Sequence, residues 1–445
     1  TIMRILNKIK IFIFSVLIMV SCTIDEQVNP NNPALENILE GATRTDLNNL
    51  VVGGLANMRS SYSNYVTAFG SIAREFYLFD ADPRNTTDLL GTTGGLDNNS
   101  FYTTASWNDR YQTIKNMNII LDALPKADPS VSAAQKQGYS AFAKTLKAHQ
   151  LLLLINAQNN NGIRVDVANP KNLGPIVDKA TAFNTIATLL NEAFTELTGA
   201  EFAFSLTSGF TNFDTPATFG KFNRALAARV ALYRGLHADA LTFLNASFFD
   251  LNGDLTVGPK MVYSTAGPDV LNDLFKTPQQ SGNQIVVNNS FIADAEAGDQ
   301  RVANKTALRD SPTAKSGVNG THETRLYASS TSPIDIIRNE ELILIYAEAK
   351  IETNQLADAI TALDIIRTKS GGLPTLAVAK PTVDDQAELR DEMLHQRRYS
   401  FWCEGQRAID LRRYNRLNST YVTIDPIAGE TQIIFTEFPV PATEN

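Results

Sequence analysis

The sequence is poor in the residue types that carry most catalytic chemistry. It has only two cysteines and four histidines, and the histidines are scattered: His149, His237, His322 and His395. None belongs to an HExxH motif or has a carboxylate or cysteine partner at metal-ligand spacing. A GxSxG nucleophile motif is also absent from the sequence. We therefore expect no catalytic residues, no cofactor and no enzymatic activity.

Positive charge is also scarce. The chain carries 39 Lys and Arg residues against 47 Asp and Glu residues, which gives a formal net charge of −8. Phosphate backbones are bound by a concentrated basic surface, so nucleic acid is excluded as a partner. Residues 250–254 resemble the start of a calcium loop, but Leu255 occupies the position that needs glycine and no matching glutamate follows. A calcium site is not expected there.

Long apolar runs are lacking, and the one near the N-terminus spans only residues 11–20. A membrane-spanning helix needs roughly 20 such residues. Basic residues precede this run and Ser21-Cys22 follow it, which is the pattern of a lipoprotein signal whose cysteine is lipidated. The alternative is an apolar element of a soluble core. The abrupt change to Asp25, Glu26 and an Asn/Pro stretch favours a signal at 1–21, lipidation of Cys22, and a linker over 22–35.

Most of the remaining chain shows helical periodicity. Apolar and small residues recur at steps of three and four at Trp107, Tyr111, Ile114, Asn118 and Leu121, and the pattern resumes at Ala141. Similar patterns predict helical hairpins near 107–157, 219–247 and 338–369. Small residues at their contact positions are typical of tetratricopeptide-like pairs. Long irregular segments separate the hairpins, which argues against an uninterrupted solenoid.

Three loop-rich stretches interrupt these helices, over residues 80–106, 202–213 and 253–333. The first is rich in Asn, Thr, Gly and Asp, the second contains four phenylalanines, and the third includes short β-like runs such as residues 284–287. Loops on a rigid scaffold are where binding sites usually lie. We therefore look for ligand contacts there. Trp107 and Trp402 lie in helical patterns instead, and are expected in the core, as is Cys403.

The C-terminal third contains an ordered series of motifs. Arg338, Glu340 and Glu341 lead into Tyr346-Ala347-Glu348-Ala349 and Asn354, followed by Arg397-Arg398, Glu404-Gly405-Gln406-Arg407, Asp410-Leu411-Arg412-Arg413 and Phe438-Pro439-Val440-Pro441. Together with the lipoprotein start and the helix at 107–121, this series resembles the SusD/RagB family of outer-membrane nutrient-binding lipoproteins. The spacing of Glu404, Arg407, Asp410 and Arg412 suggests charge pairs between neighbouring helical turns.

The resemblance implies a mostly α fold, in which tetratricopeptide-like hairpins form a scaffold and loops with a few short strands build the ligand face. Residues 36–445 would form a single SusD-like domain. The family also implies a lipid anchor in the outer membrane at the cell surface, and a SusC-like TonB-dependent transporter as partner. The expected function is then capture of an oligosaccharide or other small polymer fragment and its delivery to that transporter.

Sugar recognition typically combines flat aromatic surfaces with amides, carboxylates and arginines. Because both tryptophans are expected in the core, tyrosine and phenylalanine would have to supply the aromatic surface. The candidate ligand residues in the loops are Tyr77, Phe79, Asp80, Arg84, Asn85, Phe101, Tyr102 and Tyr327. A second interpretation stays open at this stage: a lipid-anchored helical-repeat scaffold that binds a protein or peptide partner.

Overall fold

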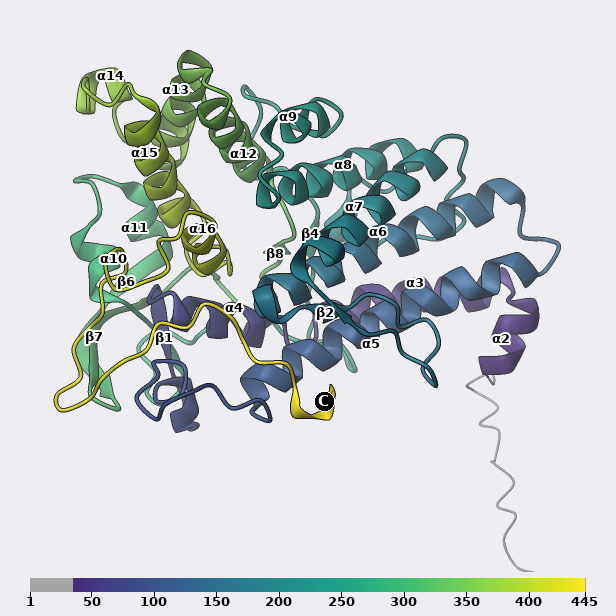
Figure 1. Ribbon diagram of the computed structural model, residues 1–445, viewed down its shortest axis with the longest axis horizontal. Coiled ribbons are helices and arrows are strands. Elements are labelled where there is room, and N and C mark those ends of the chain that lie inside the picture. The colour runs from purple at the N-terminus through teal and green to yellow at the C-terminus, as the bar shows by residue number, and fades with distance from the viewer. Residues whose placement is uncertain (1–34, 445) are drawn as a thin grey trace, which may run out of the picture.

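The computed structural model describes residues 35–444, and helices dominate it (Figure 1). The predicted signal at 1–21, Cys22 and all but the last residue of the predicted linker lie outside the described residues. The helices are α2 (Leu35–Gly41), α3 (Arg44–Asn57), α4 (Tyr62–Ile72), α5 (Phe101–Ala123), α6 (Ala133–Gln158), α7 (Lys179–Glu196), α8 (Pro216–Tyr233), α9 (His237–Asn245), α10 (Asn289–Ala293), α11 (Gln300–Lys305), α12 (Asn339–Glu352), α13 (Leu356–Ile365), α14 (Leu376–Ala379), α15 (Gln386–Ser400) and α16 (Arg407–Arg413).

The longer helices form a row in which each packs on the next. The order is α5, α6, α7, α8, α9, α12 and α13, with α3 covering α5 and α15 closing the far end (Figure 1). The three predicted hairpins correspond to the pairs α5–α6, α8–α9 and α12–α13. Helix α7 bridges α6 and α8 and makes the row continuous. The mostly α, tetratricopeptide-like fold is thus confirmed.

Local sequence signals fix where these helices begin. At α6, the Ser132 side chain accepts a hydrogen bond from the Gln135 backbone N–H. The Gln135 side chain in turn accepts one from the Ser132 backbone N–H. This reciprocal capping satisfies two donors that the first helical turn would leave unpaired. Helix α5 starts at Phe101 directly after Ser100, so the predicted loop over 80–106 ends earlier than expected. Phe101 and Tyr102 therefore belong to the first turn of α5.

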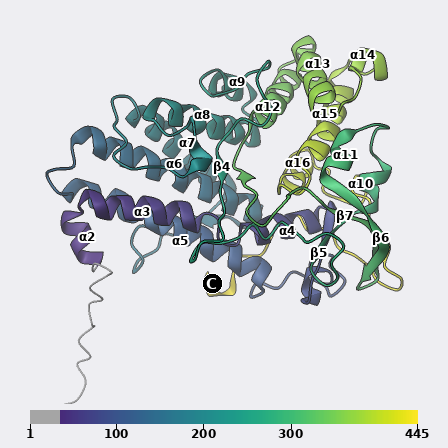
Figure 2. The ribbon, with the colours of Figure 1, turned by 180° about the vertical axis from the view of Figure 1, so that it is seen from behind.

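A small antiparallel sheet lies beside α10 and α11, at the end of the molecule away from α2 (Figure 2). Its strand order is β1-β5-β7-β6, and β1 pairs with β5 in a register that sets Tyr77 opposite Val286. Two further strand pairs join β2 to β3 and β4 to β8. The strands are β1 (Phe76–Phe79), β2 (Ile163–Arg164), β3 (Ile176–Val177), β4 (Lys260–Met261), β5 (Gln284–Val287), β6 (Thr306–Lys315), β7 (Val318–Thr324) and β8 (Ile334–Asp335).

One large hydrophobic core runs through the row of helices, and a second surrounds α12, α13 and α15. Trp107 and Trp402 are 2% and 0% exposed, and Cys403 is also fully buried, as predicted. The predicted loop at 202–213 turns its phenylalanines inward, where Phe204 packs between Tyr139 and Phe142. Among residues 35–444, no helix has the length and apolar character needed to cross a membrane.

Candidate functional site

Two of the candidate ligand residues lie in strand β1 and are buried. The Tyr77 hydroxyl donates to Asp425 Oδ2 at 3.0 Å and accepts a hydrogen bond from Asn288 Nδ2 at 2.7 Å. Phe79 packs in a small apolar cluster between the sheet and the C-terminal segment. Both side chains thus connect β1 to distant parts of the chain in this structure.

Three further candidates organise the loop between β1 and α5. Asn85 Nδ2 donates to both carboxylate oxygens of Asp80 at 3.0 Å, and Asn85 is buried. The Tyr102 hydroxyl donates to Asp88 at 3.0 Å and accepts from the Asp97 backbone N–H at 2.8 Å. These contacts give the long loop a defined shape, because they satisfy polar groups that an irregular segment would otherwise leave unpaired.

Arg84 and Phe101 reach the surface of the same loop. The Arg84 guanidinium lies 5.0 Å from the centre of the Phe101 ring and pairs with Asp82 at 2.6 Å. The hydrogen bond from Arg84 lowers the pKa of the Asp82 carboxyl. Seven of the candidates are thus gathered in β1, the loop after it and the start of α5, whereas Tyr327 lies in the wall of a separate cavity whose lining includes none of the others.

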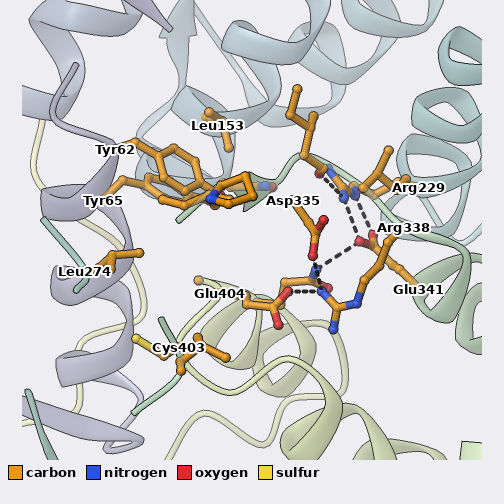
Figure 3. A pocket seen from close by; sticks show the side chains of 18 of the residues that line it. Tyr62, Tyr65, Leu153, Arg229, Leu274, Asp335, Arg338, Glu341, Cys403 and Glu404 are labelled. Atoms are coloured by element: carbon orange, nitrogen blue, oxygen red, sulfur yellow. Dashed lines mark hydrogen bonds and ion pairs between the residues drawn. The ribbon is translucent and has the colours of Figure 1, made fainter. Parts of the chain in front are cut away.

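That cavity measures about 390 Å³ and lies where the helical row meets the C-terminal part of the chain (Figure 3). Its walls come from α4, α6, α8, the start of α12, residues 326–338 and residues 403–409. The exposed lining residues, Ala328 and Pro333, mark its mouth. Residues more than 300 positions apart in the sequence therefore line one enclosed space.

One side of the cavity is aromatic. Tyr62 and Tyr65, three residues apart on α4, stack with their ring centres 5.9 Å apart and an angle of 26° between the rings (Figure 3). Tyr233 of α8 and Tyr327 also line the cavity. Burial raises the pKa of Tyr65 to about 12, and it raises the pKa of Tyr62, Tyr233 and Tyr327 further. All four side chains are therefore neutral hydroxyls at physiological pH.

The opposite side is charged, and its charges are paired. Arg229 binds Glu341 through two hydrogen bonds of 2.5 and 2.6 Å. Arg338 binds Glu404 at 2.5 Å (Figure 3). It also binds Glu340 at 2.8 Å. Burial disfavours the charge on Arg338, but Glu404 and Glu340 outweigh it and raise the pKa of the guanidinium. Likewise, Arg338 overcomes the burial of Glu340 and lowers its pKa to about 2.

These pairs correct the prediction of local bracing at 404–412. Glu404 pairs with Arg338 and Lys305, and Asp410 pairs with Arg397 and Arg413, so most partners lie on other elements. Arg412 donates instead to the backbone carbonyls of Thr436 and Asn156. The motif residues therefore join the C-terminal turn to the helical row, and the pair of Asp410 with Arg413 is the one between neighbouring turns among the pairs named here.

His149 and Asn156 of α6 form the floor of the cavity together with two leucines. Burial lowers the pKa of His149 to about 3, so its ring is neutral. Cys403 also faces the cavity, and burial raises the pKa of its thiol, which disfavours the reactive thiolate. Within residues 35–444, no group of three or more His, Cys, Asp or Glu side chains is placed to hold a metal ion.

The segment that resembles a calcium loop forms turns. Asp250 accepts a hydrogen bond from the Asn252 backbone N–H at 2.8 Å, and Asp254 accepts from the Thr256 backbone N–H at 2.8 Å. Side chains of Asp commonly close turns in this way. The carboxylates of Asp250 and Asp254 thus accept hydrogen bonds from backbone groups two residues further along the chain.

Sequence reasoning missed most of the cavity. Tyr62, Tyr65, Arg229 and Tyr233 belong to helices that were not singled out for function, and no local motif marks them. By contrast, five lining residues lie in the C-terminal motif series: Arg338, Glu341, Glu404, Gly405 and Gln406. That series was the one signal that pointed toward this part of the molecule.

Comparison with known proteins places the fold. The model of the SusD family matches residues 262–438. Surface glycan-binding protein A from Bacteroides thetaiotaomicron has a similar structure, with a TM-score of 0.67 at 15% sequence identity. That protein has also been solved in complex with laminarihexaose, and the match to the complex covers 90% of this chain and 97% of that chain. A SusD superfamily protein from Bacteroides vulgatus gives a TM-score of 0.66 at 15% identity, covering 90% and 96% of the two chains. A search of the curated proteins found no match to this sequence.

The helical row, with its inserted sheet and central cavity, thus defines a SusD-like helical-repeat protein. The resemblance seen in the C-terminal motifs agrees with these comparisons: the SusD family model matches residues 262–438, and nearly the whole chain has the fold of SusD superfamily structures.

Proposed function

We propose that this protein is a non-enzymatic glycan-binding lipoprotein of the outer-membrane surface. It captures an oligosaccharide and delivers it to a SusC-like TonB-dependent transporter, with Cys22 carrying the lipid anchor. The fold supports this proposal, because a protein of the same fold has been solved with laminarihexaose. The SusD family match supports it as well.

The observation that carries the proposal is the chemistry of the cavity. Tyr62, Tyr65 and Tyr327 offer aromatic faces for the apolar sides of a sugar ring, and Asn156 and Arg229 offer donors for its hydroxyls. The cavity is the primary binding site. Arg84 and Phe101, which reach the surface on the loop after β1, form a second contact for a longer chain.

Isothermal titration of the detergent-solubilised full-length protein against an oligosaccharide panel tests this function. We expect saturable binding of one glycan class, and a rise in melting temperature with ligand concentration, because a ligand that binds only the native state stabilises it. Tyr62→Ala should weaken that binding at least tenfold, whereas Tyr421→Ala, on the exposed C-terminal segment, should leave it unchanged. Binding of peptides alone would instead favour a scaffold for a protein partner.

The anchor is tested separately. Cys22→Ala should release the protein from the membrane fraction, because a lipid-modified cysteine is the proposed attachment. Membrane retention of that variant would contradict the proposed anchor but would leave glycan capture untouched.

A further inference from the structure

We propose that the cavity selects neutral, polyhydroxylated ligands and discriminates against glycans that carry carboxylate or sulfate groups. This inference rests on the proposed glycan-binding function and specifies the substrate class of the same site. It follows from the balance of charges in the wall and from the polar groups that the wall leaves free.

The charged groups of the wall balance one another. Three cationic side chains line the cavity, and so do three carboxylates: Lys305, Arg229 and Arg338 against Asp335, Glu341 and Glu404. Each cation already has a carboxylate partner, at 2.5 Å for Arg229 and Arg338 and at 3.6 Å for Lys305. Asp335 is paired as well, with Lys260 of the neighbouring strand. A ligand carboxylate would therefore meet no cation that lacks a counter-charge within the described wall.

The groups that remain free are mostly neutral. The hydroxyls of Tyr62, Tyr233 and Tyr327 make no hydrogen bond within residues 35–444, although these side chains line the cavity. Hydroxyls both donate and accept, which matches the hydroxyls of a sugar. The Asn156 amide, which hydrogen-bonds the Tyr65 side chain, adds a further neutral polar group beside them.

His149 adds no charge to the wall. Its Nδ1 lies 3.1 Å from Gln150 Nε2, and burial lowers the pKa of the ring to about 3, so the imidazole is neutral. The cavity thus presents hydroxyls, an amide and an imidazole to a ligand, whereas Arg229 is paired with the Glu341 carboxylate.

The cost of burying a charge explains why acidic glycans should bind more weakly than neutral ones. Moving an ionised group out of water is costly unless a partner of opposite charge receives it. A neutral sugar exchanges its water hydrogen bonds for those of the free hydroxyls and avoids this cost. We expect an acidic trisaccharide to bind at least tenfold more weakly than a neutral one of equal length.

The test compares neutral and acidic trisaccharides on the full-length protein by isothermal titration. The neutral set is built of glucose, mannose or xylose, and the acidic probe is trigalacturonate. Binding of a neutral trisaccharide should change less than twofold between 50 and 500 mM NaCl, because no net charge is recognised. Tyr327→Phe, which removes one free hydroxyl, should weaken it about two- to tenfold. Tyr421→Phe, on the exposed C-terminal segment, is the matched control and should have no effect.

A variant that removes one carboxylate from the wall should favour the acidic ligand. Glu341→Gln removes the partner of Arg229 with little change in shape, so the affinity for trigalacturonate should rise at least tenfold relative to the affinity for a neutral trisaccharide. Equal or tighter binding of trigalacturonate by the unmodified protein would overturn the selectivity and leave glycan capture intact. Failure of every trisaccharide and longer glycan to bind would overturn the proposed function itself. Should Glu341→Gln not fold, the salt series and Tyr327→Phe decide the question.

Discussion

At the scale of single residues, the most unusual group is the carboxyl of Glu75. This residue follows α4 and is 1% exposed, and neither carboxylate oxygen has a hydrogen-bond partner in residues 35–444. Burial raises the pKa of Glu75 to about 8, although Arg407, Arg398 and Lys305 oppose the shift. Glu75 is therefore protonated in the native protein at neutral pH, and ionising it costs stability.

Replacing Glu75 with glutamine should remove that cost. The unfolded carboxyl titrates near 4.5 and the folded one near 8, so between these values the native state holds a proton that the unfolded chain has released. Stability then falls as pH rises through this window and levels off above it. We expect Glu75→Gln to raise the melting temperature at pH 8 and to flatten its decline between pH 5 and 8.

The control for this experiment is Glu430→Gln, on an exposed turn, which should reproduce the pH dependence of the unmodified protein. Scanning calorimetry at several pH values measures both variants. An unchanged slope in Glu75→Gln would show that another group titrates over this range.

At the scale of elements, the α12–α13 hairpin shows how small residues permit close packing. Ala359 and Ala362 of α13 are fully buried and belong to the core that includes Ile343 and Leu344 of α12. This pattern was visible in the sequence, because the alanines recur at helical spacing. The adjoining helices α3, α4 and α7 gave no comparable signal, and only their packing against α5, α6 and α8 reveals their place.

Enlarging one of these alanines should force the two helices apart. Ala362→Leu is expected to lower the free energy of unfolding by about 1–3 kcal/mol, because added methylenes in a filled core displace neighbours from their preferred rotamers. Ala357→Leu places the same change on the exposed side of α13 and should alter stability by less than about 0.5 kcal/mol. Urea unfolding compares the two. Equal effects would show that α13 does not pack closely at Ala362.

At the scale of the whole molecule, buried ion pairs hold the C-terminal segment to the helical row. Arg338, at the start of α12, reaches Glu404 in the turn before α16 and also donates to the Ser400 carbonyl at the end of α15. One side chain therefore joins three elements and closes the charged side of the cavity. Removing one partner of such a pair leaves an uncompensated buried charge.

Arg338→Gln should consequently cost about 3–5 kcal/mol of unfolding free energy, since Glu404 and Glu340 lose their main counter-charge. Arg416→Gln breaks the pair with Asp391, whose side chain is 61% exposed, and should cost less than about 1 kcal/mol. Denaturant titrations give both values. A small loss for Arg338→Gln would mean that Lys305 alone compensates the two carboxylates.

The amino-acid sequence by itself determined the helical scaffold, the buried positions of Trp107 and Trp402, and the resemblance of the C-terminal motifs to the SusD family. These features depend on periodicity and on motifs, which are local along the chain. It also predicted ligand residues in loops, where the structure instead places Tyr77 in β1, Asn85 in the loop after β1 and Tyr102 in the first turn of α5, each hydrogen-bonded to other residues.

Only the tertiary structure decided where the cavity lies and which charges pair across it. Tyr62, Arg229, Tyr327 and Glu404 come from segments that are far apart in the sequence, and no spacing rule brings them together. The physical reason is that a cavity is shaped by packing between elements, and that a buried charge finds its partner across those elements. A linear pattern records neither.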